Sequence, residues 1–155
     1  MSFAETTHIG RKAGVKSAGD RVVALTVLIL CAGAVVVAAW LTPNPHGYGT
    51  HTRLHLPPCA FREMTGLPCP SCGLTTSMAY MAQFQFGRAF FANPFGCVGF
   101  PTVVLIGILS AFSLVSGASF SRIMEKVFGL KVLYGLALLF ILSWGFTLLT
   151  TLLKR

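Results

Sequence analysis

The chain has 155 residues, of which 54% are hydrophobic and 10% are charged, and its formal net charge is +8. This balance excludes an ordinary water-soluble domain, in which about a quarter of the residues are charged. It also argues against a nucleic-acid partner, because most basic residues flank apolar runs and form no stripe with interleaved aromatic residues.

Residues 1–20 are polar and show no periodicity, which predicts a flexible cytoplasmic tail ahead of a single membrane domain at 21–155. Three charge-free runs follow, at 22–42, 95–117 and 132–153. Each run reaches the roughly 20 residues that a helix needs to cross the hydrocarbon core. Lipid offers no hydrogen-bond partner to a free peptide group, so each run must be helical. The sequence therefore predicts an all-α integral membrane protein with three transmembrane helices, surrounded by lipid.

The first run is too long for the core of a cleaved signal peptide, so we expect it to remain as an uncleaved anchor. Its small residues Gly33, Ala34 and Ala38 would allow another helix to approach closely. A helix-mediated homo-oligomer or hetero-oligomer is therefore an expectation for this chain.

The connector at 43–94 contains three of the five cysteines and three of the four histidines. These residues are Cys59, Cys69, Cys72, His46, His51 and His55. Cys69 and Cys72 form a C-x-x-C turn, whose spacing lets both sulfurs point the same way. This concentration of potential ligands makes the connector the candidate chemical site.

The segment 74–86 lacks proline and glycine, and it predicts a short helix that is re-entrant or does not span the membrane. Cys72 would lie at the amino end of this helix, where the helix dipole favours a thiolate. We expect Gly87 to turn the chain toward the second span. Asn93 and Pro94 suit the N-cap and first position of that span.

Three interpretations of the cysteines remain open. Cys59, Cys69 and Cys72 with His55 would form a Cys3His set suited to tetrahedral zinc. Alternatively, Cys69 and Cys72 would cycle between dithiol and disulfide. In an oxidising compartment, two of the three cysteines would form a structural disulfide.

The string TGLPCPSCGLT, which spans Thr65 to Thr75, follows Cys59 and precedes an apolar segment and the Asn93-Pro94 pair. This arrangement resembles a family of bacterial membrane proteins called domain of unknown function 2752. The resemblance covers about Cys59 to Ser116, and it implies a membrane-embedded layout without implying a reaction.

The resemblance directs attention to Gly73, Thr75, Asn93 and Pro94 beside the three cysteines. The chain also departs from the family pattern at two positions. Thr76 stands where the family usually has an arginine, and Arg88 follows Gly87 where an aspartate is common. If the family relies on those charges, the site of this chain is altered.

The second connector, at 118–131, has the pattern of a short amphipathic helix. Apolar residues recur at 120, 123, 124, 127 and 128, while Arg122, Glu125 and Lys126 take the opposite face. This pattern predicts an interfacial helix on an anionic leaflet.

The distribution of lysine and arginine predicts the orientation of the chain. One side would carry seven of them, with four in residues 1–21 and three in the second connector. The other side would carry five, with three in 43–94 and two at the carboxyl terminus. We therefore expect a cytoplasmic amino terminus in a bacterial inner membrane, with the cysteines on the other side.

The spans hold few polar groups, which argues against a transporter built from one chain. The chain has no paired carboxylates, nucleophile elbow or phosphate-binding glycine loop, so no catalytic residue is assigned. The predicted function is a small membrane accessory or scaffold protein that presents the cysteine loop at the membrane surface, with zinc as candidate cofactor. The alternative is a membrane thiol oxidoreductase that uses Cys69 and Cys72.

Overall fold

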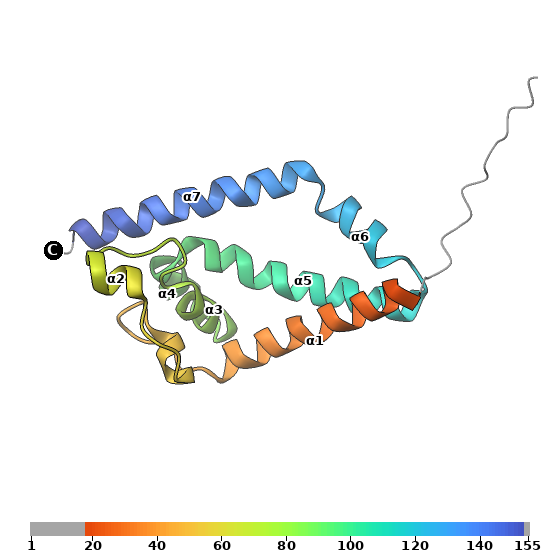
Figure 1. Ribbon diagram of the computed structural model, residues 1–155, viewed down its shortest axis with the longest axis horizontal. Coiled ribbons are helices and arrows are strands. Elements are labelled where there is room, and N and C mark those ends of the chain that lie inside the picture. Colours follow the sequence, from red (N-terminus) through yellow and green to blue (C-terminus); the bar gives the residue numbers. More distant parts are fainter. Residues whose placement is uncertain (1–17, 154–155) are drawn as a thin grey trace, which may run out of the picture.

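The long helices follow the apolar runs. The computed structural model describes residues 18–153, apart from the side chains of His51 and Leu54, and most of the predicted tail therefore lies outside the described residues. Three helices are long and apolar enough to cross a membrane, namely α1 (Ala18–Trp40), α5 (Pro94–Ser116) and α7 (Leu130–Leu153). They coincide with the three predicted spans, and the described range contains no strand, so the all-α fold class is confirmed (Figure 1).

Helices α1 and α5 pack side by side in antiparallel directions (Figure 1). The Ser110 hydroxyl, late in α5, donates to the Ala24 carbonyl, early in α1. A Cβ added at Gly107 would lie 3.3 Å from the Cys31 Cβ, so a glycine here permits the close approach of the two helices. Van der Waals contact between small residues therefore holds this pair together.

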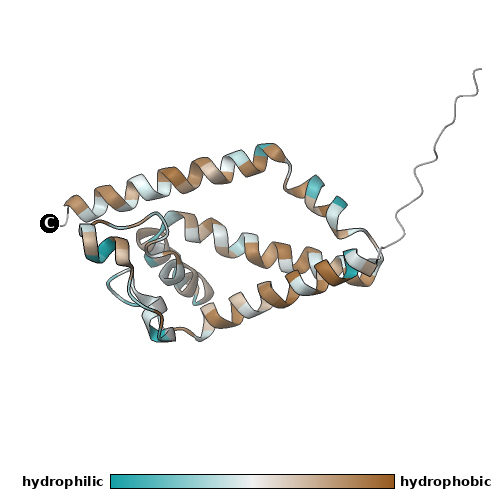
Figure 2. Cartoon of the chain, in the orientation of Figure 1, coloured by the Kyte–Doolittle hydropathy of each residue, from teal (hydrophilic) through white to brown (hydrophobic). Residues whose placement is uncertain are grey.

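Helix α7 lies apart from α1 and meets α5 near one end (Figure 1). The rings of Phe95 and Phe140 pack edge to face there, with centroids 5.2 Å apart. Large side chains on the outer faces of the long helices are exposed, including Trp40 at 78% and Val115 at 90%. Figure 2 shows that hydrophobic residues predominate along the three long helices, and their exposed apolar side chains suit contact with lipid.

The short helices of the first connector gather at one end of the long helices (Figure 1). They are η1 (Thr50–Leu54), α2 (Ala60–Thr65), α3 (Leu74–Ala82) and α4 (Phe86–Ala92). The carboxyl end of α7 lies at this same end, whereas the start of α1 lies at the opposite end. The cysteine connector is therefore placed at a boundary of the helical bundle.

The predicted short helix after the C-x-x-C turn is confirmed as α3, but it ends at Ala82, and a second short helix, α4, begins at Phe86. Phe84 between them has a left-handed backbone with φ of 59°, and Gln85 N donates to the Tyr80 carbonyl at 2.9 Å. Gly87 lies inside α4 and does not make the turn. The left-handed backbone of this residue costs about 1 kcal/mol or more. Burial of Ala89 and Ala92 against Tyr80 offsets this cost.

The predicted amphipathic helix of the second connector is α6 (Phe120–Val127). Phe120 is buried, while Arg122 and Lys126 are exposed. The Asp20 carboxylate, at the start of α1, accepts hydrogen bonds from Phe120 N at 3.1 Å and from Ser121 Oγ at 2.8 Å. A side chain from another helix thus satisfies donors at the amino end of α6.

Candidate metal centre

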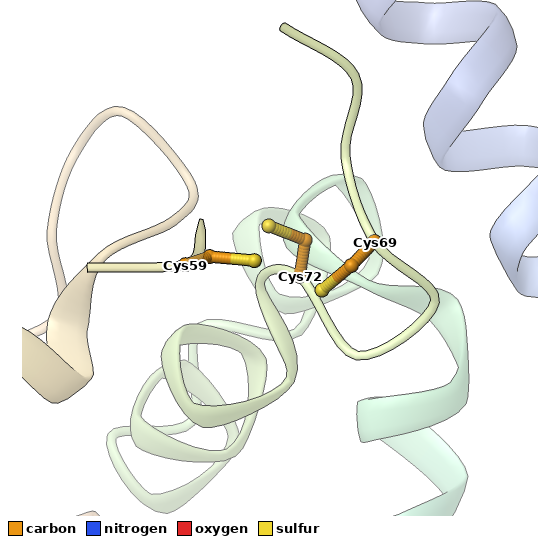
Figure 3. A group of neighbouring side chains, drawn as sticks. All are labelled: Cys59, Cys69 and Cys72. Carbon is orange, nitrogen blue, oxygen red and sulfur yellow. The ribbon is translucent and has the colours of Figure 1, made fainter. Parts of the chain in front are cut away.

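Three cysteine sulfurs converge in the first connector. The Sγ atoms of Cys59, Cys69 and Cys72 all lie within 4.8 Å of one another. Cys59 precedes α2, and its side chain points toward the turn that carries Cys69 and Cys72 (Figure 3). Zinc–sulfur bonds of about 2.3 Å place the sulfurs of a tetrahedral site about 3.8 Å apart. The three cysteines are therefore close enough to hold a metal ion.

Backbone hydrogen bonds and one glycine shape the turn between Cys69 and α3. Cys72 N donates to the Cys69 carbonyl at 2.9 Å, and Leu74 N donates to the Ser71 carbonyl at 3.1 Å. Gly73 has φ of +83°, and an added Cβ would lie 2.3 Å from the Ala92 oxygen and 2.8 Å from the Gly47 oxygen. The position requires glycine both for its backbone conformation and for this close approach.

The buried Asn93 side chain connects the cysteine turn to two long helices. Its Nδ2 donates to the Cys72 carbonyl at 3.0 Å, and its Oδ1 accepts from Gly96 N at 3.3 Å. The second bond is the predicted N-cap of α5, with Pro94 at the first turn. The same Oδ1 accepts from the Ser143 hydroxyl of α7 at 2.9 Å. Sequence reasoning predicted the cap but missed the bonds to Cys72 and Ser143.

A second contact from α7 reaches the other side of the turn. Trp144 Nε1 donates to the Pro68 carbonyl at 3.1 Å, one residue before Cys69. Ser143 and Trp144 are adjacent in the chain, so one turn of α7 supports both ends of the C-x-x-C segment. Their polar groups within a charge-free and largely apolar run were the signal that could have identified them.

Thr76 is fully buried, and its Oγ1 forms a hydrogen bond with Thr50 Oγ1 at 2.7 Å. Thr50 Oγ1 also accepts from Asn44 N at 3.0 Å, so the pair fixes the first part of the connector against α3. Arg88 lies at the surface, where its Nη1 donates to Gln85 Oε1 at 3.1 Å. Neither departure from the family pattern puts a charge into the described cysteine cluster.

Residues 59–107 match the model of a protein family of unknown function, DUF2752. The resemblance predicted from the cysteine string is confirmed by this match, which begins at Cys59 and ends within α5. No curated protein and no solved structure matches the chain. The DUF2752 segment contains all three converging cysteines, together with Gly73, Thr75 and the Asn93-Pro94 pair, whereas Ser143 and Trp144 lie outside it.

The three cysteines of the DUF2752 segment differ in environment. Burial raises the pKa of the Cys69 thiol, but hydrogen bonds from Ser71 and Cys59 outweigh burial and hold that pKa below its usual value. Burial also raises the pKa of the Cys72 thiol, which remains above its usual value despite a hydrogen bond with Arg62. Burial therefore opposes the thiolate form that the helix position predicts for Cys72, whose side chain is 8% exposed.

One cation lies beside the sulfurs. The guanidinium carbon of Arg62 stands 3.5 Å from the centroid of the Tyr48 ring, and Arg62 also hydrogen-bonds the Cys72 side chain. A cation held over an aromatic ring keeps its charge while its position is restricted. The hydrogen bond with Arg62 lowers the pKa of the Cys72 thiol and so partly offsets its burial.

The histidines do not join the three sulfurs in the described part of the chain. The fourth predicted ligand, His55, is exposed at the end of η1, and it is not among the residues that converge. His46 lines a neighbouring recess with Arg62 and Cys72. The side chain of His51 lies outside the described residues.

All five cysteines are free thiols in this structure. Cys31 lies in α1 and Cys97 lies in α5, where its Sγ is 3.8 Å from Ser77 Oγ. Both are separate from the cluster of the connector. They provide matched positions at which a cysteine can be changed without altering the candidate site.

Proposed function

We propose that this protein is a small membrane accessory or scaffold protein that holds one zinc ion at Cys59, Cys69 and Cys72. The observation that carries the proposal is the convergence of three sulfurs from two separate stretches of the connector, within 4.8 Å. Thiolate donors suit zinc, which accepts tetrahedral sulfur coordination without redox chemistry. The ion would join the segment before α2 to the turn before α3, and it would stabilise a connector that has little apolar core.

The proposed setting is a bacterial plasma membrane with the amino terminus in the cytoplasm and the cysteine cluster at the opposite surface. Two features support this setting. The connector gathers at one end of three helices that could cross a membrane, and the lysine and arginine distribution favours a cytoplasmic amino terminus. Lipid is the proposed partner of the exposed apolar faces. Helix contact with a second chain would use Gly33 and Ala34 of α1, which are exposed, whereas Ala38 is buried within the chain.

Elemental analysis of the purified full-length protein in detergent tests the metal proposal. We expect about one zinc per chain in the native protein and none in the variant Cys59→Ser/Cys69→Ser/Cys72→Ser. The matched control is Cys31→Ser/Cys97→Ser, which makes the same chemical change outside the cluster and should retain the zinc. Equal metal content in the native protein and the triple variant would refute the proposal.

Labelling in intact cells tests the position and the ligation of the thiols together. A membrane-impermeant maleimide is applied to cells that express the Cys31→Ser/Cys97→Ser variant, with and without a membrane-impermeant chelator. We expect weak labelling that increases when the chelator removes the metal, because bound thiolates are protected. No labelling until the cells are lysed would contradict the proposed orientation, while leaving the metal proposal intact.

A thiol oxidoreductase is the second candidate, and the difference in burial between Cys69 and Cys72 favours it. The partly exposed Cys69 thiolate would attack a partner disulfide and release one partner thiolate. The Cys72 thiolate would then displace the second partner sulfur, leaving a Cys69–Cys72 disulfide and a partner reduced by two electrons. Thiol–disulfide exchange requires such a pair, in which the exposed cysteine attacks the partner and the buried one resolves the mixed disulfide.

Trapping separates this candidate from the metal site. In Cys72→Ser, the mixed disulfide on Cys69 cannot be resolved, so a reductant-sensitive adduct should accumulate in cells. Cys69→Ser is the control and should trap nothing. A zinc-loaded protein that yields no adduct favours the metal site, whereas a stable cysteine–cysteine link in the unreduced native protein, without zinc, favours a structural disulfide.

A further inference from the structure

The three-sulfur cluster leaves one position of a tetrahedral ion without a described protein ligand. No described histidine or carboxylate joins Cys59, Cys69 and Cys72. Structural zinc sites are closed by four protein ligands, whereas sites with three protein ligands keep the fourth position for an exchangeable molecule. The donor set therefore has the form of an open site.

Two of the three cysteines line a common cavity. It has a volume of about 400 Å³, and Cys59 and Cys72 both line it. Its other walls include Tyr48, Arg62 and Glu63. A volume of this size falls in the range of small-molecule sites and far exceeds the roughly 30 Å³ of one water molecule. A small ligand could therefore reach the metal from this side.

The chemistry of the cluster selects the class of ligand. A divalent ion with three thiolates has a net charge of −1, so it is a weak Lewis acid with a preference for soft donors. The cavity carries one charge of each sign, on Arg62 and Glu63, so its walls do not favour a strongly charged molecule. Arg62 lines this cavity together with Cys59 and Cys72, which places its positive charge near the position that an additional thiolate would take.

We propose that the metal centre binds a small exogenous thiol as its fourth ligand, through the cavity lined by Tyr48, Arg62 and Glu63. This inference rests on the proposed metal function and extends it from a closed structural site to a ligand-binding one. The thiol gives its proton to solvent as its sulfur takes the fourth position, because a thiol that coordinates such an ion is deprotonated. The ligand is released by the reverse of this exchange, with no change in oxidation state.

Cobalt substitution tests the inference. Co²⁺ replaces zinc in the full-length Cys31→Ser/Cys97→Ser protein in detergent, without oxygen, and the sulfur-to-cobalt charge-transfer band is recorded. Titration with 2-mercaptoethanol should increase this band by roughly a third, as three thiolate ligands become four. Ethylene glycol, which has a hydroxyl in place of the thiol, is the control and should leave the band unchanged.

Two matched variants test the role of the cavity wall. Arg62→Gln should weaken thiol binding by about tenfold, because the charge that balances the fourth thiolate is lost. Arg53→Gln removes an exposed arginine of η1 and should leave binding unchanged. Equal thiol affinity in the two variants would overturn the assignment of the cavity.

The outcomes distinguish this inference from the proposed function. Failure to bind cobalt refutes the metal site itself. If cobalt binds but the thiol does not change the charge-transfer band, only the open fourth position is refuted. The same conclusion follows if His51→Ala or His55→Ala changes the spectrum recorded without thiol, because a histidine then supplies the fourth ligand. Removal of cobalt by the thiol, seen as metal-free protein after gel filtration, also overturns the inference.

Discussion

The first connector and helix α7 bury their residues in different ways. The connector contains fully buried polar side chains, including Thr50, Thr76, Ser77 and Asn93, each with a hydrogen-bond partner. Helix α7 is longer than any helix of the connector, yet Ser143 is its one buried residue. The connector is therefore held by specific internal contacts, whereas α7 is exposed along most of its length and forms hydrogen bonds to the connector and to α5 at Ser143 and Trp144.

This difference shows where substitutions should matter. A buried hydrogen bond that loses one partner leaves the other without compensation, which costs about 1–3 kcal/mol. An apolar side chain that faces lipid can be exchanged for another with little effect, because lipid is as apolar as the protein. A substitution that changes one or two atoms in the connector should therefore reduce stability more than a larger substitution on the outer face of α7.

The largest effect is expected from Gly73→Ala. The new methyl group would overlap the Ala92 and Gly47 carbonyl oxygens, and the residue would keep an unfavourable positive φ. We expect a loss of about 3 kcal/mol or more in stability, together with loss of bound zinc, measured by thermal unfolding in detergent and elemental analysis. Gly87→Ala is the matched control, because nothing lies within 4 Å of its added Cβ. Equal melting temperatures for the two variants would refute the close approach at Gly73.

An intermediate effect is expected from Asn93→Ala, which removes the α5 cap and the bonds to Cys72 and Ser143. The expected destabilisation is about 2–4 kcal/mol, because the helix loses its N-cap and the buried partners of Asn93 lose their hydrogen bonds. Asn93→Asp keeps an acceptor for Gly96 and Ser143 but cannot donate to the Cys72 carbonyl. It should retain part of the stability while weakening zinc binding, as measured by competition with a chelator. Wild-type zinc affinity in Asn93→Asp would show that this bond does not position the cysteine turn.

The smallest effect is expected from Trp144→Phe, which removes the one bond from α7 to the Pro68 carbonyl and retains most of the ring. A loss of about 1 kcal/mol corresponds to roughly fivefold weaker zinc binding if the bond positions Cys69. Trp40→Phe, at an exposed position of α1, is the control and should bind zinc normally. Unchanged affinity in both variants would mean that α7 does not support the cysteine turn.

Two features of the connector were outside the reach of sequence reasoning. The break between α3 and α4 falls at Phe84, where no glycine or proline signals a turn, and packing of α4 against α3 compensates for the unfavourable backbone. The high pKa of the Cys72 thiol follows from burial, which depends on residues far along the chain. A local pattern predicts hydrogen bonds within a helix, but it does not predict the loss of water caused by distant segments.

The sequence by itself determined the three long helices, because uninterrupted apolar length decides whether a segment suits lipid. It also determined the Cys69–Cys72 turn and the cap at Asn93, since both depend on residues close together in the chain. Tertiary structure alone decided that Cys59 meets this turn, that His55 does not, and that Ser143 and Trp144 support it from α7. These contacts join segments separated by long stretches of chain, and their distances follow from packing of the whole connector against the long helices.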